Sequence, residues 1–375
     1  MDQPPRPVSI SVVMPAFNSA STIERSVDAV LAAMGPEDEL ILANDASTDG
    51  SIDAIEARQD SRLRVVHAEK NIGRGPVRNL GAQKATGDVL VFIDSDVAVH
   101  ADAFDRLREA FAADSDLVAV IGSYDAAPGD NGVVSQYRNL LHHHTHQTRP
   151  RTANHFWTGL GAIRRGVFTE LGGLDTALWA RNMEDVEFGH RVRDTGNEII
   201  VMPEVQGSHL KAFTTRSMFY SDLRERAIPW SNLIMSDGFR VDHFVVSFSK
   251  VVSVLCVALM GLALVASPWF EFAPYLFIGA AVVFLAQNAS LWWLMYRQCG
   301  LRAALASIPL HFLHSFTCGL GALLAIANRS LWILRGRPPE ATPAGDIRSR
   351  RWGRNRAVNV EQEPEQEPEQ DATEV

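Results

Sequence analysis

The stretch Asp88-Val89-Leu90-Val91-Phe92-Ile93-Asp94-Ser95-Asp96 decides the fold of this 375-residue chain. Its apolar run has the length of a buried strand, and two carboxylates one residue apart follow directly. At the carboxyl end of a strand in an open α/β sheet, such a pair projects into the crevice where ligands bind. Its oxygens suit Mg²⁺ or Mn²⁺, which bridge to substrate phosphates. The alternative is that Asp94 opens a loop and Asp96 caps a helix starting near His100.

Three other apolar runs precede this strand, and segments of helical length separate them. These predicted strands are Val8–Met14, Glu39–Ala43 and Leu63–His67. The alternation of strands and helices predicts a parallel α/β sheet covered on both faces. Carboxyl ends of parallel strands share one edge, so Asn18 and Asp45 should converge with the Asp94–Asp96 pair on one site.

Several classes of protein are disfavoured by what the sequence contains and lacks. It has neither a G-x-x-x-x-G-K-[ST] loop nor a G-x-G-x-x-G after the first strand, which argues against a P-loop ATPase and a dinucleotide dehydrogenase. The net charge of −9 argues against nucleic acid as a partner. The three cysteines show no disulfide framework or metal-site spacing, which fits a reducing compartment. Met1–Pro7 does not resemble a secretory signal, so the catalytic part is expected in the cytoplasm.

The C-terminal third contains long uncharged runs, each long enough to cross a bilayer as a helix. They are Val251–Phe270, Phe272–Tyr296 and Ala303–Asn328. Before them, Ser217–Ser236 mixes large apolar residues with arginines, which is typical of a helix lying at a membrane interface. The predicted domains are therefore a catalytic domain (1–215), an interfacial segment (216–240), a membrane region (241–334) and a disordered basic-then-acidic tail (335–375).

Basic residues predict the orientation of this membrane region. Lys250 before the first run, with Arg297 and Arg302 at the second connection, places the catalytic domain and that connection in the cytoplasm. Three crossings would put the tail outside, although Arg335–Arg356 contains seven arginines. Either the third run re-enters or lies along the interface, or the tail is exported against the rule. The expected location is the cell membrane, multi-pass, with a cytoplasmic catalytic domain.

A set of motifs resembles the family 2 glycosyltransferases in both order and spacing. The motifs are Val12–Asn18, Asn44–Ser51, Asn71–Asn79, Gly87–Asp96, Gly159–Arg165, Gly172–Asp175 and Glu184–Gly189. The resemblance covers roughly residues 8–230. It implies a GT-A fold, which is Rossmann-like with a mostly parallel sheet. It also implies a nucleoside diphosphate sugar as donor and a divalent cation, Mg²⁺ or Mn²⁺, as cofactor.

The resemblance also implies roles for residues in the first half. The donor-binding residues are Pro15, Ala16, Phe17, Asn18, Asp45, Arg74 and Asp94. Asp96 is implied to coordinate the cation, with Asp94 near the ribose or the metal. The family's usual Asp-Asp-Gly-Ser is here Asn44-Asp45-Ala46-Ser47, so one carboxylate is missing. Asp45 could instead form an Asx-type turn.

In the second half, Glu184 and Asp185 fall in the first turn of an amphipathic helix. The resemblance implies that Asp185, next to Glu184, is the general base, since an acceptor hydroxyl must lose its proton as it attacks. One base opposite the leaving group implies inversion of the anomeric centre. The alternative is that both acids only complement the helix N-terminus. His209 is implied as a third metal ligand, or is a surface histidine.

Two aromatic segments remain open in function. Trp157 and Gly159 suit close approach of an acceptor sugar, or form a tight turn packed under a core tryptophan. His142 and His146 share one face of a predicted helix over Val133–Thr148. A polar helix flank near the membrane or the substrate is favoured there over a metal site.

The expected function is inverting, metal-dependent sugar transfer to a hydroxyl acceptor at the cytoplasmic membrane face. The acceptor is expected to be a lipid or lipid-linked glycan, as in cell-envelope synthesis. Arg226–Trp230 is only loosely similar to the Gln-x-x-Arg-Trp signature of processive synthases, which argues against that group. The alternatives are a polyprenyl-phosphate sugar synthase and a catalytically inert membrane scaffold that binds nucleotide sugars.

Overall fold

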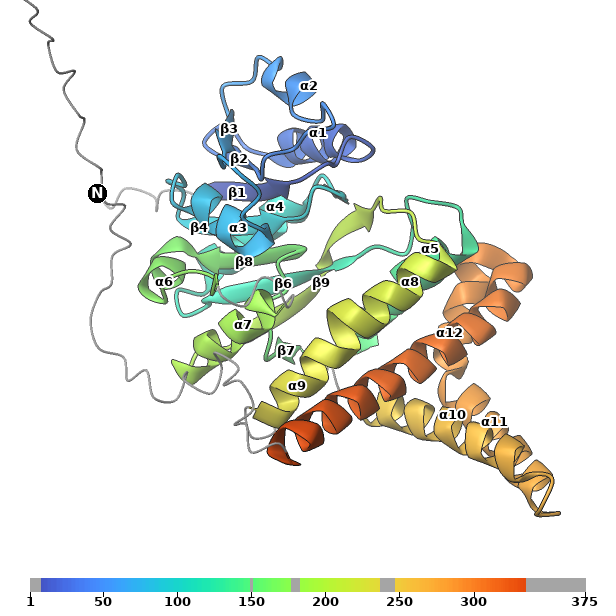
Figure 1. Ribbon diagram of the computed structural model, residues 1–375. Helices are drawn as coiled ribbons and strands as arrows, with labels where there is room; N and C mark the ends of the chain where they lie inside the picture. Colours follow the sequence, from blue (N-terminus) through green and yellow to red (C-terminus); the bar gives the residue numbers. More distant parts are fainter. Residues whose placement is uncertain (1–7, 149–150, 177–182, 237–246, 335–375) are drawn as a thin grey trace, which may run out of the picture.

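The computed structural model describes residues 8–148, 151–176, 183–236 and 247–334 (Figure 1). The predicted tail at 335–375 lies outside the described residues. The first half forms the parallel part of one sheet, with the order β3-β2-β1-β4. These strands are β1 (Ile10–Ala16), β2 (Glu39–Asn44), β3 (Leu63–His67) and β4 (Val89–Ile93). The predicted α/β class is confirmed, and the strand order reverses between β1 and β4, where such sheets bind ligands.

The second half extends the same sheet beyond β4 through β8, β6, β9 and β5. These strands are β5 (Val97–Val99), β6 (Ala119–Tyr124), β7 (Thr152–Ala153), β8 (Leu160–Arg164) and β9 (Ile199–His209). β8 runs antiparallel to β4 and β6, while β6 and β9 are parallel. The sheet is therefore mixed. The short β5, which the sequence did not predict, pairs with the end of β9.

Helices cover both faces of the sheet, which explains the continuous apolar runs of its strands. α1 (Ile23–Ala33), α2 (Asp53–Glu56) and α4 (Ala103–Ala113) cover one face. α3 (Arg74–Ala82), α6 (Arg165–Glu170) and α7 (Glu184–Asp194) cover the other. In β4, Val91 packs on the first face and Phe92 on the second. α4 begins at Ala103 after Asp102, so the interpretation of Asp96 as its cap is wrong.

A long helical segment follows β9 and lies beside α5 (Val133–Thr148) and α12 (Figure 1). Its parts are α8 (Thr215–Tyr220), the π-helix η2 (Ser221–Ala227) and α9 (Ile228–Ser236). A capping box between Thr214 and Ser217 starts it. Pro229 cannot donate to the carbonyl of Glu225, and the widened π-turn lies at this point.

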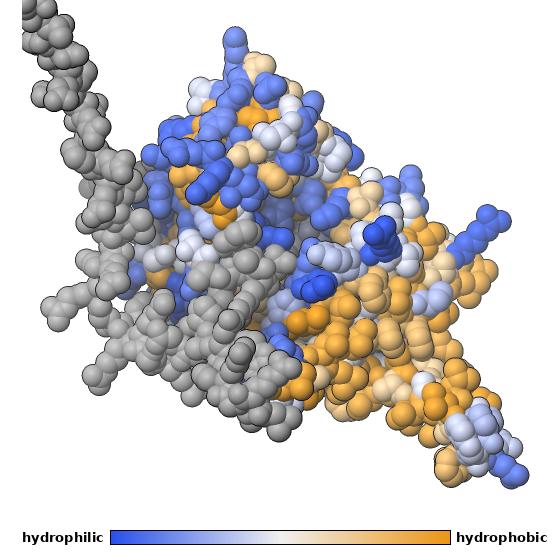
Figure 2. All heavy atoms as spheres, in the orientation of Figure 1, coloured by the Kyte–Doolittle hydropathy of each residue, from blue (hydrophilic) through white to orange (hydrophobic). Residues whose placement is uncertain are grey.

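The C-terminal helices are α10 (Phe248–Ala266), α11 (Ala273–Gln287) and α12 (Ala289–Leu334). By length and composition, α10 and residues 289–331 of α12 could span a membrane, while α11 is shorter. The predicted run Phe272–Tyr296 is not one helix, because α11 ends at Gln287 and α12 begins at Ala289, with the non-helical Asn288 between them. Apolar residues cover this part of the surface (Figure 2). Gly300, at φ +82°, kinks α12, which then packs along α9 and η2.

Candidate active site

The loops that follow β1 and β2 contact each other at the carboxyl edge of the sheet. The backbone N–H of Asn18 donates to Ser47 Oγ (3.2 Å), and Asn18 Oδ1 accepts from the N–H of Thr48 (2.9 Å). Asn18 has a positive φ of 48°, which asparagine tolerates well. Phe17 beside it is 51% exposed. These two loops are thus in contact and leave the Phe17 ring accessible, while the expected convergence of Asn18 and Asp45 with the Asp94–Asp96 pair stays a prediction.

Asp45 is buried behind these loops and braces the start of α3. Its carboxylate accepts from the N–H groups of Ile72 (2.6 Å) and Gly73 (2.9 Å). This fixes the turn that presents Arg74 at the first position of α3. Asn44, which replaces the family's carboxylate, accepts from the N–H of Ser47 at 2.9 Å. The donor contact of Asp45 therefore stays a prediction, while its structural role is visible.

Arg78 joins the two halves of the site. Its Nη2 donates to Asp94 Oδ1 at 2.5 Å, and its Nη1 donates to Glu184 Oε1 at 3.3 Å. The Arg78 side chain is only 3% exposed. Sequence reasoning did not assign Arg78 a role, although the residue lies within one of the resembling motifs. Asn79 adds a second link, exchanging hydrogen bonds of 2.8 and 2.9 Å with the backbone of Leu174.

Asp96 and His209 face each other across the β5–β9 pair. Val97 is in register with His209, and the N–H of Leu210 donates to the carbonyl oxygen of Asp96 at 2.8 Å. This places His209 Nε2 3.6 Å from Asp96 Oδ2. Burial would raise the pKa of Asp96, but the His209 ring and the charge of Lys211 hold it below its ordinary value. Asp96 is therefore kept ionised.

The Asp96–His209 pair fits a divalent cation. Asp96 Oδ1 is buried and has no hydrogen-bond partner among the described residues. One carboxylate and one imidazole are ligand types that suit Mn²⁺, and further oxygen ligands would complete its coordination. Within the part of the chain that the structure describes, no three His, Cys, Asp or Glu side chains are grouped to hold a metal. Asp94 Oδ1 accepts from Arg78, and its predicted role as a metal ligand stays a prediction.

Glu184 and Asp185 occupy the first turn of α7, as predicted. Burial and then the neighbouring charge of Asp185 raise the pKa of Glu184 to about 7. Burial also raises the pKa of Asp185, against the opposing charges of His155 and Arg78. Asp185 Oδ1 accepts from the N–H of Val186 at 2.8 Å. A carboxylate with a raised pKa is a stronger base than an ordinary aspartate, which suits proton abstraction.

Aromatic rings form a wall next to these acids. Trp157 packs edge-on against Tyr124 and against His146, each at 4.9 Å between ring centroids. Tyr124 stacks on His209 at 4.4 Å. Burial lowers the pKa of His146 to about 3, so its ring is neutral. The predicted helix face shared by His142 and His146 is thus an aromatic flank of the site, with 6.4 Å between the two ring centroids.

The wall depends on Gly159. A Cβ atom there would lie 2.6–2.8 Å from three atoms of the Trp157 indole, so the ring would have to move. We expect Gly159→Ala to raise the acceptor KM about tenfold, from roughly 1.4 kcal/mol of lost ring placement, with donor binding unchanged. Steady-state kinetics with either substrate varied test this. Gly166→Ala is the matched control, because no atom lies within 4 Å of its Cβ. Equal acceptor KM values in both variants would contradict the role.

One cavity of about 750 Å³ connects these groups. Its lining includes most of the predicted site residues: Arg74, Asp94, Asp96, Trp157, Gly159, Glu184, Asp185 and His209. Pro15, Ala16, Phe17, Asn18 and Asp45 are not part of this lining; they lie along the neighbouring β1–β2 edge. Residues that sequence reasoning missed also line it, including Arg78 and Tyr124. Tyr124 ends a strand, but nothing in the local sequence indicates which way its ring points.

The sheet with its switch-point crevice, an acidic pair after β4 and an acid on the opposite wall define a nucleotide-sugar transferase domain of the GT-A type. Comparison with known proteins gives the family. Residues 11–172 match the model of glycosyl transferase family 2. This domain of the chain belongs to that family.

Two relatives show the extent of the sequence similarity. The glycosyltransferase GlyG of Streptococcus pneumoniae is 33% identical over 117 residues, covering 31% of this chain and 38% of GlyG. The succinoglycan biosynthesis protein ExoO of Rhizobium meliloti is 33% identical over 111 residues, covering 30% and 32%. This chain thus spans less than half of these relatives.

A solved structure matches over most of the chain. The mannosyltransferase PcManGT from Pyrobaculum calidifontis, in complex with GDP-Man and Mn²⁺, has a TM-score of 0.50 and 20% identity. The match covers 86% of this chain and 87% of PcManGT. At this identity the similarity supports the fold.

Proposed function

We propose that this chain transfers a sugar from a nucleoside diphosphate sugar to a hydroxyl acceptor, with inversion of the anomeric centre. The observation that carries the proposal is the single cavity that holds the Asp96–His209 pair and Asp185 together. The diphosphate end of the donor would lie at Asp96, and the acceptor hydroxyl at Asp185. Arg78, bonded to Asp94 and Glu184, fixes the two sides relative to each other.

The proposed reaction is a single displacement. Asp185 accepts the proton of the acceptor hydroxyl as its oxygen attacks the anomeric carbon, and the bond to the nucleoside diphosphate breaks on the opposite face. Asp96 and His209 would hold Mg²⁺ or Mn²⁺, which would neutralise the charge that develops on the departing diphosphate. Arg74 and Lys211, which also line the cavity, contribute fixed positive charge near this leaving group. The Phe17 ring and the Pro15–Asn18 loop would hold the base.

We also propose that the reaction takes place at the cytoplasmic face of the membrane, on a lipid or lipid-linked glycan. The cavity continues from the acidic groups to residues of α10 and α12, which among the described residues are the two helices long and apolar enough to span a bilayer. Basic residues flanking these helices support the orientation.

The test is nucleoside diphosphate release by the full chain in detergent with Mn²⁺, across a set of donors. GDP-mannose is the first donor to test, because PcManGT was solved with it. We expect Asp96→Asn to raise the Mn²⁺ concentration for half-maximal rate by about tenfold or more, because a charged ligand is lost. Asp116→Asn, an exposed change outside the cavity, is the control. A chain that turns over no donor would support the inert scaffold instead.

A further inference from the structure

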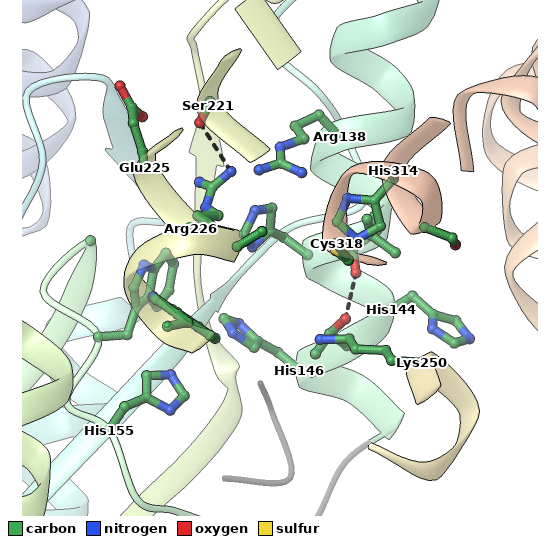
Figure 3. Close-up of a pocket in the computed structure, with 18 of the residues that line it drawn as sticks. Arg138, His144, His146, His155, Ser221, Glu225, Arg226, Lys250, His314 and Cys318 are labelled. Atoms are coloured by element: carbon green, nitrogen blue, oxygen red, sulfur yellow. Dashed lines mark hydrogen bonds between the residues drawn. The ribbon is translucent and has the colours of Figure 1, made fainter. Parts of the chain in front are cut away.

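The cavity extends past the aromatic wall into a second region between α5, η2 and α12. Figure 3 shows side chains from these helices converging there, with the guanidinium groups of Arg138 and Arg226 directed toward one another. Both groups contact the same oxygen, Asp222 Oδ1, at 2.7 and 3.4 Å. The π-turn η2 supplies both Asp222 and Arg226. None of these three residues takes part in the proposed chemistry.

Arg138 is a buried charged side chain that has fewer hydrogen-bond partners than donor groups. It is 2% exposed and is among the largest fully buried side chains of the molecule. Its Nη1 donates to Asp222, but Nε and Nη2 have no hydrogen-bond partner in the described ranges. Buried polar groups are nearly always paired, and an unpaired charged donor is costly. Because Arg138 lines the cavity, a ligand there can supply the missing acceptor atoms.

The charges around Arg138 favour an anion. Asp222, 1% exposed, is shared by Arg138, Arg226 and the His314 ring, whose Nδ1 lies 2.8 Å from Asp222 Oδ2. Lys250 and Glu225 line the same region. The two guanidinium groups and the His314 ring therefore share one buried carboxylate, Asp222. Two buried or half-buried guanidinium groups around one carboxylate favour the binding of a further anionic group.

The apolar end of the cavity indicates what carries the anion. Its lining there includes Val251, Leu255, Ala322 and Ile326 of α10 and α12. Leu255 is 61% exposed, and it belongs to α10, one of the apolar helices long enough to span a membrane. A ligand filling the whole cavity would be apolar at α10, anionic at Arg138 and polar at Asp185.

We propose that Arg138 and Arg226 bind the phosphate or diphosphate group of a lipid-linked acceptor, whose chain leaves between α10 and α12. This inference rests on the proposed function and names the acceptor's anchoring group. The planar guanidinium fork matches phosphate oxygens with two parallel hydrogen bonds. The phosphate group thereby sets how far the acceptor hydroxyl reaches toward Asp185.

The test measures ligand binding to the full chain in dodecyl maltoside, without donor or metal. Decyl phosphate, decanol and inorganic phosphate are titrated, with tryptophan fluorescence as the readout, since Trp230 lines the cavity. We expect decyl phosphate to bind at least about tenfold more tightly than either of the others, because only it supplies both the anion and the chain. Inorganic phosphate binding as tightly as decyl phosphate would overturn the lipid assignment.

Variants locate the site. Arg226→Gln is expected to weaken decyl phosphate binding about tenfold or more, by loss of a charge-assisted hydrogen bond. Arg138→Lys, which keeps the charge but not the fork, is expected to weaken it as well. Arg224→Gln removes the same charge from an exposed position of the same helix, outside the cavity lining, and serves as the control. Equal affinities in Arg226→Gln and Arg224→Gln would overturn the proposal. A chain that binds decyl phosphate as expected but releases no nucleoside diphosphate contradicts the proposed function alone.

Discussion

Asp185→Asn is expected to lower kcat by about 10²–10⁴-fold while leaving the donor dissociation constant unchanged, because proton abstraction contributes that much to such a step. The amide keeps the volume of the side chain and can still accept from the N–H of Val186. It cannot accept the acceptor's proton. Single-turnover release of nucleoside diphosphate, with donor binding measured separately, separates the loss of chemistry from a loss of binding.

The pH dependence adds a second readout. The base acts when ionised, so the rate falls as pH drops through its pKa. Burial raises the pKa of Asp185, which places this acidic limb above the range of an ordinary aspartate. In Asp185→Asn the limb should disappear. Asp194→Asn, at the exposed end of the same helix, should keep both rate and limb. An unchanged limb in Asp185→Asn would assign the proton transfer to another group.

The residues at the carboxyl edge of the sheet could be predicted from the sequence, because local patterns determine where each strand ends. Each strand is an apolar run of the right length, and each polar cluster follows its strand directly. Chain order alone therefore placed Asn18 beside the loop after β2, and Asp94 one strand away. The acidic first turn of α7 could also be predicted, since an acidic pair before an amphipathic run is a local signal for the start of a helix.

The remainder depends on contacts that sequence periodicity does not encode. Arg78 and Glu184 are 106 positions apart, and their pairing depends on α3 and α7 covering the same face of the sheet. Asp45 has the residue type expected of a donor contact, yet its carboxylate accepts from a backbone loop 27 positions away. The aromatic wall could not be predicted, because it depends on the direction in which the rings at the strand ends point. The helix boundary at Asn288 lies within an apolar run whose composition predicts one continuous helix.

Arg78→Met is expected to destabilise the fold by about 3–5 kcal/mol, the range found when one partner of a buried ion pair is removed. Without Arg78, Asp94 and Glu184 lose their shared cation, and Glu184 is only 2% exposed. Denaturant unfolding of the full chain in detergent measures the loss. Arg74→Met, at an exposed position one turn earlier on α3, controls for the general effect of removing a charge.

A double variant separates the ion pair from simple packing. Arg78→Met/Glu184→Gln should recover part of the lost stability, because the carboxylate that was left unpaired is gone, whereas a packing defect would add to the Glu184→Gln effect. The pH response gives the same distinction. Glu184 has its pKa raised to about 7, so its contribution to stability is fully present below its ordinary pKa of 4.5 and is lost as pH rises through 7. The charge of Arg78 opposes the increase in the pKa of Glu184. Without it that pKa should be higher still, so Arg78→Met should lose more stability than the parent between pH 6 and pH 8. Parallel pH profiles would mean that Arg78 does not stabilise the charged form of Glu184.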